Sequence, residues 1–211
     1  MENLQYISQG KTPEAHLRNI MKVCEAGGKW VQLRLKNAKP KDQLKIAFLA
    51  KRICDRYGTR LIVNDNVMIA KKLDVDGVHL GLKDMCTKEA REFLGDKIIG
   101  GTANTLEDCL MHIKNGVDYI GLGPFRFTST KKQLSPLLGA EGYQSIVKEL
   151  RQQGHKTPVF AIGGIAEDDF AELSGTGVSG IAVSGILTGK DKEDIKNIIS
   201  TYHTVFRTES V

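Results

Sequence analysis

Short apolar runs recur along the chain, and a small cluster of polar residues or glycines directly follows most of them. The runs predict eight β-strands, at 4–8, 29–35, 60–65, 76–80, 97–101, 117–122, 157–162 and 178–183. Each run is rich in β-branched or other apolar residues and is bounded by Gly, Asp or Lys, as strands commonly are. If the strands are parallel, the polar clusters all meet at one end of one sheet, where α/β proteins place their chemistry.

Amphipathic stretches with helical spacing separate several of these strands. They cover 13–27, 42–58, 105–116 and 192–206, and three of them end at a glycine suited to a helix C-cap. The alternation predicts an α/β fold, a (β/α)₈ TIM barrel that residues 1–211 form as a single domain. A doubly wound open sheet is the structural alternative. No stretch rich in proline and serine marks a second domain.

Composition and charge are typical of a globular enzyme domain. Hydrophobic residues make up 41% of the chain, and the net charge of +5 is spread without a long block of one sign. The N-terminus lacks a basic segment followed by an apolar one, and no apolar stretch approaches the ~18 residues of a membrane span. We therefore expect a cytoplasmic protein that binds small molecules rather than nucleic acid or membranes. The sequence leaves its oligomeric state open, and a homo-oligomer is possible.

The cysteines do not indicate a metal or redox centre. Cys24, Cys54, Cys86 and Cys109 lie more than twenty residues apart, and no C-x-x-C pair occurs. We interpret them as free thiols in a reducing compartment.

The segment VQLRLK at 31–36, in the second predicted strand, carries two cations. Side chains alternate along a strand, so Gln32, Arg34 and Lys36 share the face that would point into the barrel and toward its mouth. Two buried cations are costly unless an anion neutralises them, and a diphosphate ligand is the simplest such partner. An internal ion-pair network and an edge strand with a solvated face are the structural alternatives.

Carboxylates follow the next two predicted strands. Asn64 and Asp65 end the third strand, and Asp84 follows the fourth just past Gly81. Neighbouring parallel strands are ~4.8 Å apart, so the two acids could hold one divalent cation. Magnesium suits such a site because it usually takes one or two carboxylates and completes its shell with water and phosphate oxygens. Alternatively, Asp84 caps a helix and Asp65 closes a turn.

Glycine clusters follow the last two predicted strands. Gly163 and Gly164 follow the seventh strand, and Ser184 and Gly185 follow the eighth, each before a predicted short helix. Loops at these two places in a (β/α)₈ barrel often bind a phosphate through backbone N–H groups. Tight turns between strand and helix also need glycine, so the pattern alone leaves both interpretations open.

Five ordered motifs give the chain a family resemblance. They are QLRLK at 32–36, VND at 63–65, DGVHLG at 76–81, GPFRFTSTK at 123–131 and AIGGI at 161–165. With these motifs the chain resembles the thiamine-phosphate synthase (thiamine-phosphate pyrophosphorylase) family from about residue 29 to about residue 190. The resemblance implies a transferase that joins hydroxymethylpyrimidine pyrophosphate to thiazole phosphate, releasing pyrophosphate and forming thiamine phosphate with the help of Mg²⁺.

The resemblance also implies a role for each motif residue. The pyrimidine pyrophosphate would be held by Gln32, Arg34, Lys36, Asn64 and Lys131, and magnesium by Asp65 and Asp84. The thiazole phosphate would be held by Thr128, Ser129, Thr130, Gly164, Val183 and Ser184. Arg34, Lys131 and Thr102 would act on the departing pyrophosphate, Thr102 by a hydrogen bond from its hydroxyl. Charge stabilisation of that leaving group needs no side-chain nucleophile.

Several positions depart from the family pattern. Leu82 and Lys83 replace two polar residues before Asp84, Thr102 replaces a serine, and Phe127 replaces a common proline. We expect these changes to affect efficiency and loop geometry more than reaction class. A loop spanning Gln133 to Gly139 is a candidate lid.

Two other functions compete with the synthase interpretation. A thiazole tautomerase of the same fold would use a histidine as its acid/base where this chain has Asn104. An inactive barrel that binds phosphate ligands is the second alternative. We interpret His79, at the end of the fourth predicted strand, as a core or supporting group.

Overall fold

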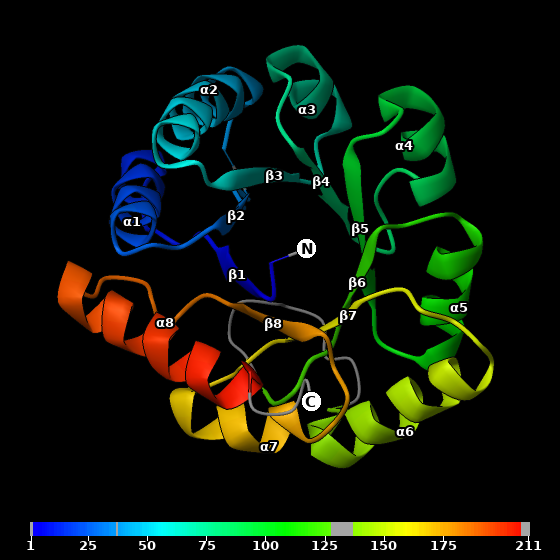
Figure 1. Ribbon diagram of the computed structural model, residues 1–211. Helices are drawn as coiled ribbons and strands as arrows, with labels where there is room; N and C mark the ends of the chain where they lie inside the picture. The colour runs from blue at the N-terminus through cyan, green and yellow to red at the C-terminus, as the bar shows by residue number, and fades with distance from the viewer. Residues whose placement is uncertain (1, 37, 128–136, 208–211) are drawn as a thin grey trace.

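Eight parallel strands form a closed barrel with helices around it (Figure 1). The computed structural model describes residues 2–36, 38–127 and 137–207. The strands are β1 Leu4–Ile7, β2 Trp30–Leu33, β3 Arg60–Asn64, β4 Gly77–Leu80, β5 Ile98–Ala103, β6 Tyr119–Leu122, β7 Val159–Ile162 and β8 Gly180–Val183. Their order around the barrel is their order in the chain, and β8 pairs with β1 to close it. The predicted (β/α)₈ barrel is confirmed, and the open sheet is excluded.

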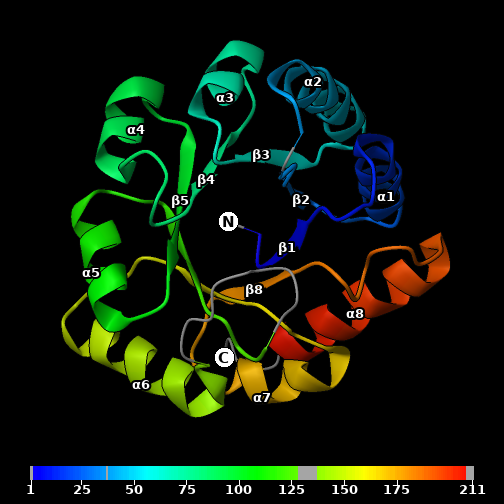
Figure 2. The same ribbon diagram turned by 180° about the vertical axis from the view of Figure 1, so that it is seen from behind.

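Helices cover the outside of the barrel in both views (Figures 1 and 2). They are α1 Pro13–Glu25, α2 Pro40–Tyr57, α3 Val67–Leu73, α4 Thr87–Leu94, α5 Leu106–Lys114, α6 Gly139–Gln152, the 3₁₀ turn η1 Glu167–Asp169, α7 Phe170–Ser174 and α8 Lys192–Arg207. Local sequence explains several ends. Thr105 caps α5 through a reciprocal bond with Asp108, and Gly58 ends α2 in the left-handed region, at φ 59°.

The strands separate two hydrophobic regions. Side chains that point outward pack against the helices in the main core. Inside the barrel, Trp30, Ile62, Tyr119 and Phe160 form a second cluster, with the Trp30 and Tyr119 rings edge to face at 4.9 Å between centroids. The barrel interior is therefore filled at this level, which leaves the carboxyl ends of the strands as its open, polar end.

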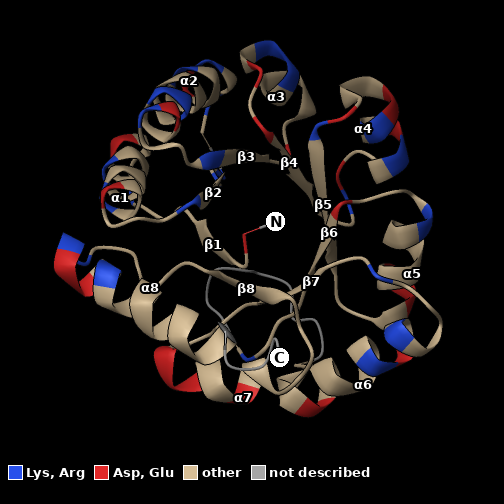
Figure 3. Cartoon of the chain, viewed as in Figure 1, with Lys and Arg blue, Asp and Glu red and all other residues tan. Residues whose placement is uncertain are grey.

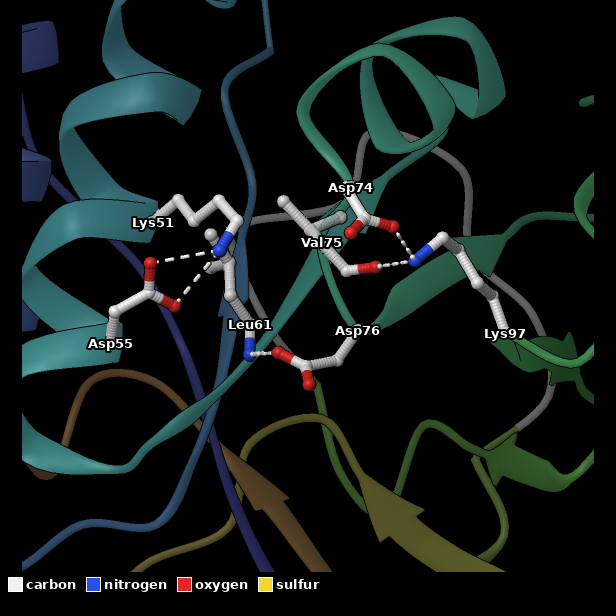
Figure 4. Close-up of polar contacts among 7 residues, drawn as sticks. All are labelled: Lys51, Asp55, Leu61, Asp74, Val75, Asp76 and Lys97. Atoms are coloured by element: carbon white, nitrogen blue, oxygen red, sulfur yellow. Dashed lines mark hydrogen bonds and ion pairs between the residues drawn. The ribbon is translucent and has the colours of Figure 1, made fainter.

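Side chains just before β4, β6 and β8 fasten the amino-terminal end of the barrel. Asp76 accepts a 2.8 Å hydrogen bond from the backbone N–H of Leu61 (Figure 4), and Asp118 accepts one of 2.8 Å from that of Ile99. Ser179 accepts similarly from the first residue of β7, at 3.2 Å. Each bond ties the start of one strand to the residue before the next, so this end of the barrel serves stability.

Charged residues lie mainly on the helices and in the loops (Figure 3). Within the eight described strands only Arg60 is charged. None of the helices in the described residues has the length and apolar character that crossing a membrane requires.

Candidate active site

The ends of β2, β3 and β4 bring together the predicted cations and carboxylates. Arg34 and Lys36 follow β2, Asp65 follows β3 and Asp84 follows β4. The Lys36 Nζ lies 3.6 Å from Asp65 Oδ2. The predicted convergence is therefore present, with part of the ion-pair network that was its structural alternative.

Asp65 carries an unfavourable charge in this arrangement. Burial and the neighbouring Asp84 carboxyl raise the pKa of Asp65 to about 6, although Lys36 and Arg34 oppose the shift. Its backbone is also unusual, at φ 65°, a region that non-glycine residues seldom occupy. Two carboxylates this close repel each other when both are ionised, and a divalent cation bound between them would offset that repulsion.

A backbone turn holds Asp84. Its Oδ2 accepts a 2.7 Å bond from the N–H of Gly81, and its own N–H donates to the Gly81 carbonyl at 3.0 Å. Leu82 and Lys83, which depart from the family pattern, are exposed side chains within this turn. Both of the bonds that hold Asp84 run to the backbone of Gly81 rather than to these two side chains. The predicted helix cap is not seen, because α4 begins after Cys86.

Arg34 is half-buried at the mouth, and residues from β1 and α1 support its backbone. Its N–H donates a 3.0 Å bond to Ser8 Oγ, which lies 2.9 Å from His16 Nδ1. Burial lowers the pKa of the Arg34 guanidinium, while the Asp65 carboxylate opposes that shift. A buried cation of this kind is well placed to bind an anionic ligand.

Gln32 begins a polar chain that crosses the barrel interior. Its Nε2 donates to Gln5 Oε1 at 3.2 Å, and Gln5 Nε2 donates to the Tyr119 hydroxyl at 3.2 Å. The chain continues from Tyr119 to His79 Nδ1 at 3.0 Å, and from His79 Nε2 to Thr102 Oγ1 at 2.9 Å. Gln32 is thus buried below the mouth, whereas Thr102, at the end of the chain, is partly open.

The loops after β6 and β7 pair with each other. The backbone N–H of Phe125 donates to the Ile162 carbonyl at 3.0 Å, and that of Arg126 donates to Gly163 at 3.1 Å. The Arg126 guanidinium also lies 2.6 Å from Asp169, whose side chain is buried. These bonds place the loop beside the glycine turn after β7.

That glycine turn needs its glycines. Gly163 and Gly164 have φ of 96° and 73°, and a Cβ on Gly164 would lie 2.6 Å from Arg126 Cγ. After β8, Ser184 Oγ donates to Gln9 Oε1 at 3.2 Å, and the Ser184 carbonyl begins a helical turn rather than the predicted helix. The Val183 side chain packs in the core, so it can offer only backbone groups to a ligand.

Some predicted site residues cannot be placed. Thr128, Ser129, Thr130, Lys131 and most of the predicted lid lie outside the described residues. Asn64 ends β3 half-buried, and the Asn104 amide donates to the Gly123 carbonyl, which joins the ends of β5 and β6. Sequence reasoning missed Gln5, Tyr119, Ser8, His16 and the Arg126–Asp169 pair. Gln5 was detectable as an inward polar position in an apolar strand, whereas the others depend on contacts between distant segments.

Comparisons with known proteins agree on one family. The family model described as thiamine monophosphate synthase matches residues 4–187. A thiamine-phosphate synthase of Flavobacterium johnsoniae is 51% identical over 193 residues, 91% of each chain, and one of Bacteroides fragilis is 48% identical over 95% of this chain and 100% of its own. Among solved structures, a thiamine phosphate pyrophosphorylase from Pyrococcus furiosus superposes with a TM-score of 0.84 at 30% identity, covering 96% of both chains.

Proposed function

We propose roles for the residues of this barrel mouth on the premise that the chain belongs to the thiamine monophosphate synthase family and has its thiamine-phosphate synthase function. The observation that carries the assignment is the meeting of Arg34, Lys36, Asp65 and Asp84 at the ends of three adjacent strands. Cations for a diphosphate and carboxylates for a divalent ion are what this transfer reaction needs. The reaction joins hydroxymethylpyrimidine pyrophosphate to thiazole phosphate.

The diphosphate would lie against Arg34, Lys36 and Asn64, with Lys131 and Thr102 at its leaving oxygens. Support comes from the half-buried guanidinium of Arg34, whose charge the Asp65 carboxylate partly offsets. A charge-assisted hydrogen bond to such a ligand contributes about 1.5–3 kcal/mol. Gln32 lies deeper and would face the pyrimidine rather than the phosphates.

Asp65 and Asp84 would hold Mg²⁺. The residues fit the ion because two close carboxylates, one with its pKa raised to about 6, gain from a shared cation. Magnesium usually takes one or two protein carboxylates and completes its shell with water and phosphate oxygens, so a pair of carboxylates is enough to hold it. When bound, the ion would neutralise charge on the diphosphate oxygens.

The thiazole phosphate would bind across the barrel mouth, at the loops after β6, β7 and β8. Gly164 is exposed, Ser184 is half-buried, and both follow strand ends with backbone groups open to an anion. Val183 would contribute backbone only. Thr128, Ser129 and Thr130 would complete this site from the adjoining loop.

The residues would act by position and charge rather than by covalent catalysis. The bond between the pyrimidine methylene carbon and the diphosphate oxygen breaks, and its electron pair leaves with the diphosphate. Arg34, Lys131 and Thr102 stabilise the charge that develops on that oxygen. The thiazole nitrogen then bonds to the methylene carbon, which completes thiamine phosphate.

A direct assay tests this proposal. The protein is incubated with the two substrates and Mg²⁺, and thiamine phosphate is measured with Asp84→Asn as the variant and Asp74→Asn as the matched surface control. We expect product with the wild type and the control, and a loss of turnover of orders of magnitude with Asp84→Asn, because a charged metal ligand becomes neutral. Wild-type protein that binds both substrates without forming product would instead indicate the inactive barrel.

The tautomerase alternative is not favoured. Its acid/base position is Asn104 here, an amide that cannot exchange protons near neutral pH and that donates to the Gly123 carbonyl. Turnover of a thiazole carboxylate phosphate without metal or pyrimidine would reverse this assignment. We further propose that residues 1–211 work as a single barrel domain in the cytoplasm on small-molecule substrates.

A further inference from the structure

The polar chain inside the barrel has a direction, because each hydrogen bond in it has one donor and one acceptor. It runs from Gln32 through Gln5, Tyr119 and His79 to Thr102, with bonds of 2.9–3.2 Å. All members except Thr102 are at least 96% buried. The partly open end at Thr102 is therefore where the chain can meet the diphosphate at the barrel mouth.

The amide nitrogen of Gln5 sets this direction. It donates to the Tyr119 oxygen, which leaves the single hydroxyl proton of Tyr119 available for His79 Nδ1 at 3.0 Å. A neutral imidazole that accepts at Nδ1 carries its proton on Nε2. With that tautomer the proton would be donated to Thr102 Oγ1, 2.9 Å away, and the Thr102 hydroxyl would direct its own proton elsewhere.

We propose that this buried chain fixes the tautomer of His79 so that Thr102 presents its hydroxyl proton, rather than a lone pair, to the leaving diphosphate. The inference rests on the proposed synthase function and adds His79 and Tyr119 as positioning residues. In the opposite polarity, Thr102 would donate to His79 and turn a lone pair toward an anion, which repels it. The two polarities have the same heavy-atom positions and differ only in their protons.

The local sequence provides room for this chain. A Cβ on Gly100 would lie 2.1 Å from the Tyr119 ring, and one on Gly121 would lie 3.0 Å from the His79 ring. The inward positions of β5 and β6 are glycines where the two rings pass.

The backbone of Thr102 is fixed from the opposite side. His112 Nε2 lies 2.9 Å from the Thr102 carbonyl, and because a carbonyl only accepts, that nitrogen carries the proton. A Cβ on Gly101 would lie 2.5 Å from the His112 ring, so this contact too requires a glycine. Thr102 is thus held at its carbonyl by one histidine and at its hydroxyl by another, which leaves the hydroxyl proton as its adjustable group.

The ¹⁵N spectrum of the histidine rings tests the polarity directly in the wild-type protein. The chain has 5 histidines, and His79→Gln identifies the signals of the ring in question by removing them. We expect a His79 ring with a protonated Nε2 and a bare Nδ1. A ring protonated at Nδ1, alone or together with Nε2, overturns the proposal whether or not the enzyme is active.

Two substitutions separate the halves of the ring. In His79→Gln the amide nitrogen can reach the Nε2 position and still donate to Thr102, whereas in His79→Asn the shorter amide reaches only the Nδ1 position. We expect kcat to stay within about threefold in His79→Gln and to fall about 10- to 150-fold in His79→Asn, the range of a lost hydrogen bond to a charged group. His155→Asn, on the loop before β7, is the control and should keep wild-type activity.

A double-mutant cycle shows whether His79 acts through Thr102. Thr102→Val should lower kcat and weaken inhibition by pyrophosphate while leaving the KM for thiazole phosphate nearly unchanged. Thr102→Ser, which retains the hydroxyl, should lose less activity than Thr102→Val. Adding His79→Asn to Thr102→Val should cost little more, because the interaction is already lost. If the fold-loss of kcat in the double variant equals the product of the losses in the two single variants, His79 acts independently of Thr102 and the proposal is overturned.

The outcomes distinguish this inference from the function on which it rests. If the wild-type protein forms no thiamine phosphate, the proposed function fails, and the ring spectrum still reports the tautomer. If the wild type is active and His79→Asn matches it, only this inference fails. Should His79→Asn not fold, judged by thermal unfolding, the wild-type spectrum and the two Thr102 variants decide.

Discussion

Asp65→Asn is expected to stabilise the magnesium-free protein while it removes most of the activity. Asp65 lies close to Asp84, partly buried, and its raised pKa means that folding works against its charge. Asparagine has the same shape without the charge, and among non-glycine residues it tolerates the left-handed backbone at φ 65° well. The substitution therefore removes repulsion and adds no backbone strain.

The pKa shift sets the size of the effect. A rise from 3.8 to about 6 corresponds to about 3 kcal/mol at ~1.36 kcal/mol per unit, which is a ceiling. The side chain is 35% exposed, and solvent screening reduces the gain to about 1–1.5 kcal/mol. For a chain of this length that is a rise in melting temperature of about 2–6 °C.

The dependence on pH tests the cause. A carboxyl whose pKa is raised in the folded state does not lower the free energy of unfolding below pH ~4, because it is protonated in the folded and the unfolded protein alike. As the pH rises to about 6, it lowers that free energy progressively more. The difference in unfolding free energy between Asp65→Asn and wild type should therefore grow across that window and stay constant above it. Urea denaturation with a chelator present, at several pH values from 4 to 7.5, measures it.

Asp74→Asn is the matched control. Asp74 also has a left-handed backbone, at φ 52°, but it is exposed and pairs with Lys97 at 2.6 Å, which lowers its pKa. Loss of that charge should bring no gain in stability. If both variants behaved alike, or if the advantage of Asp65→Asn were the same at pH 4 and pH 7, the reasoning from the carboxylate pair would be refuted.

Three further outcomes are expected. Mg²⁺ should raise the melting temperature of the wild type in proportion to the logarithm of its concentration, with about 2.7 kcal/mol gained at 100 times the Kd, and an unchanged melting temperature would contradict the metal site. Arg126→Ala should lower the free energy of unfolding, measured by urea denaturation, by about 1–3 kcal/mol, because it leaves the buried Asp169 carboxylate without its cation. An unchanged free energy of unfolding would show that the ion pair does not stabilise the fold. Gly100→Ala should lower the free energy of unfolding by about 1–3 kcal/mol or more, because the added Cβ would collide with the Tyr119 ring. Gly185→Ala, where a Cβ has no atom within 4 Å, should change that free energy little.

The fold was largely predictable because its signals are local. All eight predicted strands are present, most of them a few residues shorter, and the four predicted helices correspond to α1, α2, α5 and α8. The predicted strand at 29–35 ends at Leu33, so Arg34 and Lys36 extend from a loop beyond it. Both residues nevertheless lie close to the end of the strand, and the Lys36 Nζ is 3.6 Å from Asp65 Oδ2.

The candidate site was predictable only in part. Asp65 and Asp84 could be paired because the carboxyl ends of neighbouring strands must meet. The turn that holds Asp84 by the backbone of Gly81 depends on backbone hydrogen bonds, which the types of the side chains do not reveal.

The interior polar chain needed strand register, which a single sequence does not supply. Tyr119 pairs with Gly100, and His79 pairs with Asn64 and Gly100, so the two rings pass where β5 has no side chain. A glycine on one strand and a ring on the next are each unremarkable in sequence. Only their alignment across the barrel connects Gln5, on the first strand, to the hydroxyl of Thr102 on the fifth. Sequence periodicity therefore indicates which residues face inward, whereas the partner of each, including the bond between His79 and Thr102, depends on how far neighbouring strands are shifted.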